Sequence, residues 1–267
     1  MIIKRMPTLQ PAQQLGLALV LMLLIFALGE GAFYAADPNT QQLAKAFSPP
    51  STAMPLGADQ FGRDMFARLG AALRLSFLLS ALCVATSAIT GVAAGICAAW
   101  AGGVVEKVLN FVVNTILALP GLVLVLLFAA IVPGSFIMLY LAISLTLWVE
   151  YFRLVRATAK PLINGPQLQS SMLLSFGRWY CFRRHIWPAI APDVCTLAAF
   201  GAATSIITMA SVGFVYVGLQ PPTAELGLMI VELFSYYSDA PWLLAQPLIA
   251  LFLMVLGFHL LAGKKTL

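Results

Sequence analysis

The largest group of charged residues lies between Trp148 and Pro188, inside an otherwise apolar sequence. Its basic residues are Arg153, Arg156, Lys160, Arg178, Arg183 and Arg184. Only Glu150 and Asp193, near the ends of the segment, oppose them. Arginine stays protonated near neutral pH, so it does not act as a general base, but it binds carboxylates, phosphates and protein partners. The segment therefore indicates a docking surface in an aqueous compartment rather than a catalytic centre.

The sequence lacks the residue patterns of common hydrolytic centres. It contains no His-Glu-x-x-His zinc motif, no nucleophile elbow and no phosphate-binding P-loop. Its cysteines form no Cys-x-x-Cys pair, which favours small buried residues over a disulfide or a metal site. They are Cys83, Cys97, Cys181 and Cys195. We expect no catalytic residue, no metal and no bound cofactor in this chain. We therefore do not expect the chain to hydrolyse ATP by the P-loop route.

A second polar stretch, Pro-Leu-Gly-Ala-Asp-Gln-Phe-Gly-Arg-Asp, covers residues 55–64. Its candidate residues are Gly57, Asp59, Gly62, Arg63 and Asp64. The two glycines permit tight turns, and the charged side chains can form ion pairs or cap neighbouring helices. We favour a structural role at the outer face of a membrane, with a ligand site as the alternative.

The composition places these stretches in a polytopic membrane protein made of helices. Hydrophobic residues make up 61% of the 267 residues and charged residues 9%, and the mean hydropathy is +0.94. A soluble domain needs more charge, and a β-barrel would show short alternating segments instead of long apolar runs. The net charge of +5 reflects basic residues gathered on one side of a bilayer rather than nucleic-acid binding.

We expect an all-α fold with six transmembrane helices in a single membrane domain, residues 1–267. The predicted spans are 13–36, 73–101, 108–132, 136–157, 194–218 and 242–263. The basic residues predict cytoplasmic N- and C-termini. The first apolar stretch extends towards Ala36 without a good cleavage site after it, which predicts an uncleaved first span. The parts are then a tail with the first span (1–36), an outside loop (37–72), spans two to four (73–157), a cytoplasmic loop (158–193) and the last two spans (194–267).

The interiors of these spans carry few ionisable residues. An ion-coupled carrier usually needs such groups near the membrane midplane. Ser205, Thr208 and Met209 share helical spacing, so they either line a weakly polar pore or bond between helices. Pro120 predicts a kink in the third span, and Gly91 with Gly95 predicts close helix packing in the second.

Inside the basic segment the sequence predicts a short helix. Gly165 and Pro166 suit its start, and Leu168, Met172 and Phe176 recur every four residues. Such an apolar stripe inserts into a groove on a partner or lies on the membrane surface. The residues alone leave both interpretations open.

The segment resembles the coupling loop of ABC importer permeases, and most closely the second permease subunit of the dipeptide/oligopeptide/nickel family. The resemblance rests on Trp148-Val-Glu-Tyr-Phe-Arg-Leu-Val-Arg156, on Arg184-His-Ile-Trp-Pro188 and on the stretch at residues 55–64. Counted back from His185, the Glu-Ala-Ala positions of that family fall on Gln169, Ser170 and Ser171, and its glycine falls on Ser175. Gly177 is a shifted alternative for that glycine.

The resemblance implies the type I importer permease fold and half of a translocation pore in a bacterial inner membrane. It implies a sister permease, two cytoplasmic ATP-binding subunits, an extracytoplasmic binding protein and surrounding lipid, with no nucleic acid. The cargo would be a peptide or a nickel or other metal–chelator complex. The residues that would couple to the ATPases are Arg156, Leu168, Gln169, Ser170, Ser171, Met172, Ser175, Phe176, Gly177 and His185. A stand-alone secondary transporter and a membrane scaffold without transport are the alternatives.

Overall fold

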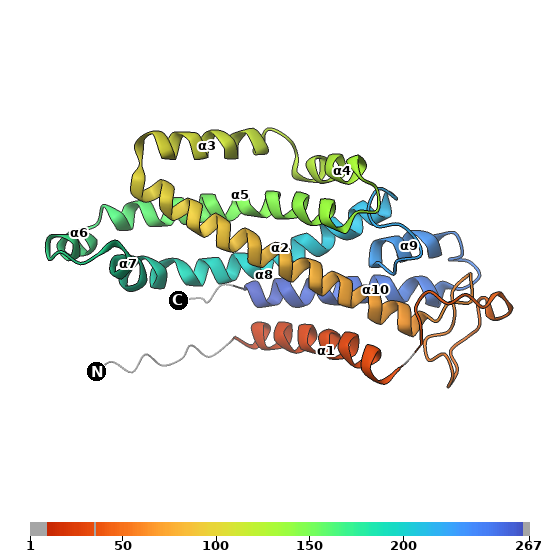
Figure 1. Cartoon of the computed structure of the whole chain (residues 1–267). Coiled ribbons are helices and arrows are strands. Elements are labelled where there is room, and N and C mark those ends of the chain that lie inside the picture. Colours follow the sequence, from red (N-terminus) through yellow and green to blue (C-terminus); the bar gives the residue numbers. More distant parts are fainter. Residues whose placement is uncertain (1–9, 35, 264–267) are drawn as a thin grey trace. The chain divides into compact units, whose positions relative to one another are not determined.

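A computed structural model describes residues 10–34 and 36–263, and this part of the chain is helical (Figure 1). In chain order the elements are α1 (Pro11–Phe33), the 3-10 turn η1 (Leu43–Lys45), α2 (Met65–Ala101), α3 (Gly103–Leu117), α4 (Gly121–Ile131), α5 (Phe136–Ile163), α6 (Pro166–Leu173), α7 (Arg178–Cys181), the π-helical turn η2 (Phe182–Ile186), α8 (Trp187–Phe214), α9 (Leu226–Phe234) and α10 (Pro241–Ala262). In the described residues, β-structure is limited to one isolated bridge between Ala58 and Asp64.

Five helical stretches in the described part are long and apolar enough to cross a membrane. They are α1, α2, α5, the continuous run Arg178–Phe214, and α10. A sixth span arises when α3 and α4 are taken together, although the two helices meet at 80°. The all-α, polytopic class predicted from composition is therefore confirmed. The basic residues near the two ends, Lys4, Arg5, Lys264 and Lys265, lie outside the described residues.

The break between α3 and α4 falls at Pro120, the N-cap residue of α4. Proline has no backbone N–H to donate, and its ring disfavours helical backbone at the residue before it. The sequence predicted a kink at this residue. The structure shows a sharper change of direction, in which the third span becomes two separate helices.

Three helices extend beyond their predicted spans. α2 begins at Met65 rather than at residue 73, because Asp64 Oδ1 accepts hydrogen bonds from the backbone N–H of Phe66 at 2.8 Å and of Ala67 at 3.3 Å. α5 continues to Ile163. The helix leading into the fifth span begins at Arg178 rather than at residue 194. Much of the predicted loop 158–193 is therefore helical.

The chain divides into two compact units. Unit 1 contains Met1–Phe77 and Pro221–Leu267, and unit 2 contains Leu78–Gln220. In unit 1, α1 runs alongside α10 (Figure 1). A Cβ on Gly16 would lie 2.6 Å from the carbonyl oxygen of Gly257, so these two glycines permit the close approach. The side chain of Gln13 closes this helix pair by donating to the carbonyl of Gly263 at 2.8 Å.

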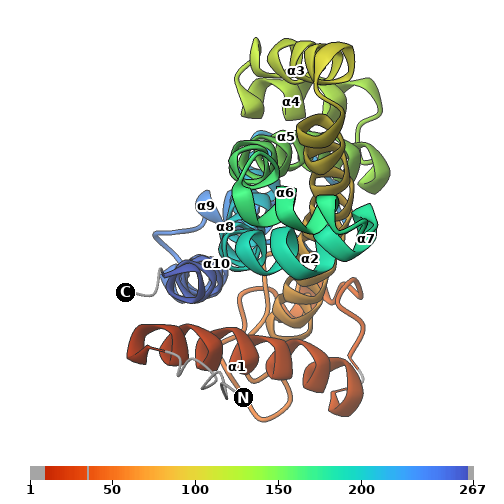
Figure 2. The same cartoon turned by 90° about the vertical axis from the view of Figure 1, so that its left-hand side faces the viewer.

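In unit 2, α5 packs against α8, α4 and α3, and Figure 2 shows this group from the side of α6 and α7. A Cβ on Gly91 would lie 2.5 Å from Cβ of Tyr151, and a Cβ on Gly95 would lie 2.9 Å from Cβ of Val155. The two glycines therefore let α2 pack directly on α5, as their spacing predicted.

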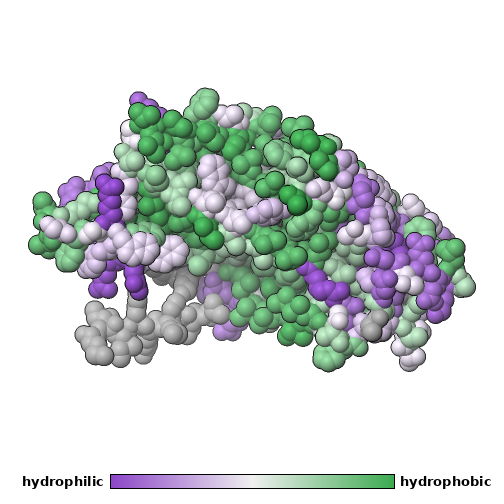
Figure 3. Space-filling view, viewed as in Figure 1, coloured by the Kyte–Doolittle hydropathy of each residue, from purple (hydrophilic) through white to green (hydrophobic). Residues whose placement is uncertain are grey.

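Figure 3 shows hydrophobic residues over the α3, α4 and α5 surface of unit 2, and a mixture of hydrophilic and hydrophobic residues around its α6–α7 end. Large apolar side chains such as Val104, Phe111 and Leu141 are exposed on these three helices. Such a surface is stable against lipid tails or against a partner membrane subunit, and unfavourable in water.

Candidate functional site

The predicted coupling helix is α6, which packs against the end of α5 and against α7 in unit 2 (Figure 1). Gly165 is its N-cap residue and Pro166 occupies its first turn, as predicted. Leu168 is 1% exposed. This leucine holds the base of α6 against its own chain, so it is unavailable for insertion into a partner.

α6 ends in a Schellman motif. The backbone N–H of Phe176 donates to the carbonyl of Ser171 at 3.1 Å, and that of Ser175 donates to the carbonyl of Met172 at 2.9 Å. This closure places Ser175 at φ +62°, in the left-handed region that favours glycine. The resemblance to the family places a glycine at residue 175. This is also the residue whose backbone is left-handed, the conformation that glycine adopts most easily.

The predicted stripe of Leu168, Met172 and Phe176 is only partly correct. Phe176 lies beyond the end of α6, where its ring stacks on Tyr180 with centroids 4.4 Å apart. In this loop the most exposed apolar side chains are instead Leu173, at 86%, and Leu174, at 72%. The search for apolar residues at every fourth position did not find Leu173 and Leu174, because both lie at the C-terminal end of α6, where the helical repeat stops. Two adjacent apolar residues in a polar loop were the available signal.

Ser171 and His185 join the two sides of the loop. Ser171 Oγ lies 3.0 Å from His185 Nε2, which connects α6 to η2. The hydroxyl also lies 3.2 Å from the carbonyl oxygen of Gln167. Both residues were predicted to contact an ATPase. In the structure they stabilise the loop itself.

The other predicted loop residues remain at the surface. Gln169 Nε2 donates to the carbonyl of Asn164 at 3.2 Å, and Ser170 Oγ donates to that of Pro166 at 2.8 Å. Gly177 is the N-cap of α7 with an ordinary negative φ, and a Cβ there would meet nothing within 4 Å. The backbone therefore requires no glycine at residue 177.

Arg156, which was predicted to couple to an ATPase, forms an ion pair within the chain. Its guanidinium donates to Glu106 Oε1 at 2.9 Å through Nε and at 2.5 Å through Nη2. Lys160 Nζ lies 2.7 Å from the same oxygen. These contacts tie the first turn of α3 to α5. The sequence could not reveal them because Glu106 lies fifty residues before Arg156.

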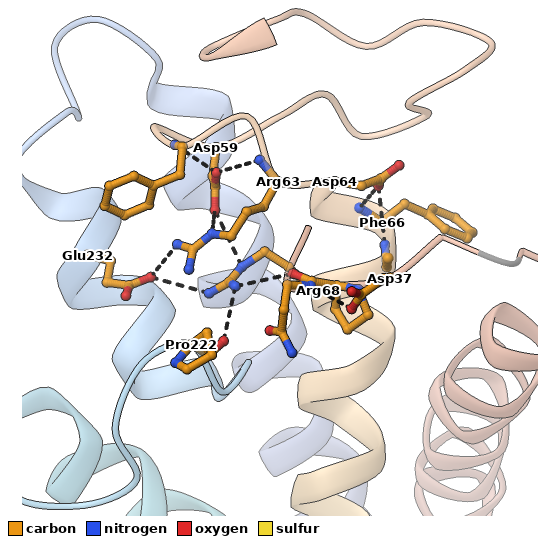
Figure 4. Close-up of polar contacts among 12 residues, drawn as sticks. Asp37, Asp59, Arg63, Asp64, Phe66, Arg68, Pro222 and Glu232 are labelled. Atoms are coloured by element: carbon orange, nitrogen blue, oxygen red, sulfur yellow. Dashed lines mark hydrogen bonds and ion pairs between the residues drawn. The ribbon is translucent and has the colours of Figure 1, made fainter. Parts of the chain in front are cut away.

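The second predicted site is a buried charge cluster in unit 1 (Figure 4). Arg63 Nε lies 2.5 Å from Asp59 Oδ2, and Arg68 Nε lies 3.5 Å from the same oxygen. Glu232 Oε2 accepts from Arg63 at 2.9 Å and from Arg68 at 3.2 Å. Two basic and two acidic residues thus neutralise one another away from solvent, as buried charges must.

The two glycines of this stretch form the turns that were predicted. Gly57 has φ +81° and Gly62 has φ +70°. A Cβ on Gly62 would lie 1.9 Å from the carbonyl oxygen of Gln42, so no other residue fits there without moving the backbone. Asp64 caps α2 and also accepts a hydrogen bond from the Tyr34 hydroxyl. Burial and the neighbouring Asp64 carboxylate raise the pKa of Tyr34 to about 12.

Sequence reasoning missed Glu232 as the partner of this cluster. It is the only charged residue of α9, whose sequence is LGLMIVELF. A single carboxylate within an apolar helix was the signal that a cation lies opposite it.

A third carboxylate, Glu225, caps α9 by accepting from the N–H groups of Gly227 at 2.9 Å and Leu228 at 2.7 Å. Burial raises the pKa of Glu225 to about 7, although the two hydrogen bonds oppose that rise.

The candidate pore residues on α8 do not lie together on an open face. Ser205 is 0% exposed and Met209 is 1% exposed. Ser205 Oγ donates to the carbonyl of Ala202 in its own helix at 2.8 Å. Only Thr208 is partly exposed. In this conformation Ser205 and Met209 pack inside the chain, which favours the alternative that they take part in helix packing.

Comparison with known proteins decides the family. The profile of the binding-protein-dependent transport system inner membrane component matches residues 91–263, which is more than half of the chain. The chain belongs to this family. It is an ABC importer permease of the peptide type, with the type I importer permease fold.

Three curated relatives agree with this membership. A probable D,D-dipeptide transport system permease protein of Escherichia coli (strain K12) is 30% identical over 84% of this chain and 75% of its own length. A dipeptide transport system permease protein of Haemophilus influenzae is 27% identical over 92% of this chain and 86% of its own. A glutathione transport system permease protein of Pectobacterium atrosepticum is 30% identical over 79% of this chain and 70% of its own.

Family membership settles the class of activity. An ABC importer permease is a transport subunit rather than an enzyme, and this one is a multi-pass protein of the bacterial inner membrane. The expectation that the chain has no catalytic role therefore follows from the family.

Proposed function

We propose that this permease forms half of a peptide translocation pore with a sister permease. An extracytoplasmic binding protein would deliver the peptide, and two cytoplasmic ATPases would supply ATP and Mg²⁺. The names of the three relatives, which concern dipeptides and glutathione, support a peptide cargo. Family membership supports this kind of assembly. Cytoplasmic N- and C-termini, as the basic residues predict, would put α6 on the side of the ATPases.

The observation that carries the coupling proposal is the apolar tip of α6, formed by Met172, Leu173, Leu174 and Phe176. Each of these side chains is exposed. Water does not favour a tip of this kind, whereas an apolar groove on a partner protein does. We propose that the tip, rather than the predicted stripe, enters the groove of an ATPase.

The base of α6 supports this role because it is held firmly. Leu168 is buried, and the Ser171–His185 contact connects α6 to the helical run that continues into α8. α6 also packs against α5. A force applied to the tip would therefore pass to two membrane-spanning helices, tilting them as the pore alternates between its faces.

The cargo proposal favours a peptide over a bare metal ion. In the described residues, no group of three or more His, Cys, Asp and Glu side chains is arranged to hold a metal. A nickel or metal–chelator complex remains the second candidate, because a chelated metal needs no protein ligands. Uptake of a labelled dipeptide and of chelated nickel, measured with the same reconstituted complex, distinguishes the two.

The coupling proposal is tested with Leu173→Asp combined with Leu174→Asp. The expected result is loss of ATPase co-purification and of ATP-driven uptake, because each carboxylate would have to be buried in an apolar groove. Leu43→Asp is the matched control: Leu43 is also exposed, at 70%, but lies in η1 of unit 1. Full ATPase association in the double variant would refute the proposal. Uptake by the purified chain alone, driven by an ion gradient, would identify a secondary transporter instead.

A further inference from the structure

Unit 2 contains an apolar groove that the coupling function does not use. Its volume is about 560 Å³. One wall is the face of α2 formed by Ala88, Ile89, Val92, Ala93, Ile96 and Trp100. The opposite wall is formed by Arg178, Trp179, Phe182, Trp187 and Val194. Arg178 is the single charged residue in this lining.

The lining favours a hydrocarbon chain over a polar cargo. A peptide backbone in this groove would lose its hydrogen bonds to water and find almost no replacement, at a cost for each unpaired group. An acyl chain has no such groups and gains from contact with the valine, isoleucine and aromatic side chains. One wall of the groove also belongs to α2, a helix long and apolar enough to cross a membrane.

Tryptophan and arginine surround one end of the groove. Trp179 is 71% exposed, and it also borders a neighbouring hollow of about 380 Å³ with Tyr180, Arg183 and Arg184. Exposed tryptophan and tyrosine gather at the level of lipid headgroups, and arginine binds phosphate. The residues around this end thus match the border between acyl chains and headgroups.

The three arginines at this end lack acidic partners. The ion pairs found in the described residues involve Arg63, Arg68, Arg74, Arg156 and Lys160 as cations, and none involves Arg178, Arg183 or Arg184. A cluster of like charges without counter-ions attracts an anion. A phosphate group at the headgroup level supplies that charge.

We propose that this groove is a binding site for an anionic phospholipid. One acyl chain lies between α2 and the aromatic wall, and the headgroup phosphate binds Arg178 and Arg183. An apolar span of another membrane subunit would fill the groove equally well but would leave the arginines without counter-charge. This charge balance favours the lipid. The site does not depend on the coupling role of α6.

The test uses the full chain, purified with its associated subunits and analysed by native mass spectrometry. After delipidation the complex is exposed to phosphatidylglycerol or to phosphatidylcholine with the same acyl chains. We expect the complex to retain at least severalfold more phosphatidylglycerol than phosphatidylcholine. This comparison needs no variant. Equal retention of the two lipids would overturn the proposal.

Two independent variants locate the site. Arg178→Gln with Arg183→Gln removes the charges, and Ala93→Trp fills the groove while keeping them. Each should reduce retained phosphatidylglycerol severalfold, whereas Arg153→Gln, which changes an exposed arginine of the same unit outside the groove, should not. Unchanged retention in both variants would refute the site. If Ala93→Trp releases another membrane subunit but no lipid, the groove is a subunit interface. That result would also refute the lipid site.

Discussion

Glu232 Oε2 lies 2.9 Å from Nη2 of Arg63, across 169 residues of sequence. The same carboxylate oxygen lies 3.2 Å from Nη2 of Arg68. This contact joins α9, which lies between the last two spans, to the loop that follows the first span. Arg63 and Arg68 are almost fully buried, so each depends on the acidic residues beside it.

Glu232→Ala should destabilise unit 1, because Asp59 alone would then balance two buried guanidinium groups. Removing one partner of a buried ion pair typically costs about 3–5 kcal/mol. A large drop in the thermal unfolding temperature of the purified protein is expected. Asp239→Ala, which changes an exposed acid just beyond α9, should have little effect. Equal unfolding temperatures for the two variants would show that the cluster contributes nothing to stability.

Ser175→Gly should stabilise the end of α6. Ser175 has φ +62°, and a Cβ in left-handed backbone costs about 1–2 kcal/mol that glycine avoids. Slower hydrogen exchange in α6 is the expected measurement. Gly177→Ser is the control and should be close to neutral, because φ there is negative and the site is an N-cap. Faster exchange in Ser175→Gly would contradict the prediction.

Substitutions along α6 should separate docking from folding. Met172→Asp and Phe176→Asp should leave the chain folded but weaken ATPase association, because both side chains are exposed at the tip. Leu168→Ala should instead lower stability by about 2–5 kcal/mol, as expected for truncation of a buried leucine. Unfolding temperature and ATPase co-purification, measured on all three variants, test this division. Normal ATPase association in both aspartate variants would remove Met172 and Phe176 from the docking surface.

Stability should also depend on pH through Glu225. Burial raises the pKa of this carboxyl from its ordinary value of 4.5 to about 7, so between these values the folded chain binds more protons than the unfolded chain. The contribution of Glu225 is thus fully present below pH 4.5 and is lost as the pH rises to about 7. Glu225→Gln should flatten this decline, and its single amide oxygen can still accept one of the two capping hydrogen bonds. An identical pH profile of the unfolding temperature in the variant would exclude Glu225 as its source.

Local rules were enough to predict the membrane class, the approximate spans and several turns. Apolar runs report the spans because the bilayer has a known thickness. Pro120, Gly165 and Gly62 act through their own backbone geometry, which distant residues change little. The Asp59–Arg63 pair was also accessible, because its members lie four residues apart.

The exposure of side chains could not be read from the sequence in the same way. Leu168 and Leu173 are the same residue type in one short helix, yet one is buried and the other is exposed. Ser205 is covered although it was a candidate for a pore lining, and Arg156 pairs with Glu106 from a distant helix. Burial and charge pairing are set by which distant segments meet in the folded chain. The sequence therefore predicted the kind of protein and its local turns, whereas the packing of distant helices determines which side chains remain available to a partner.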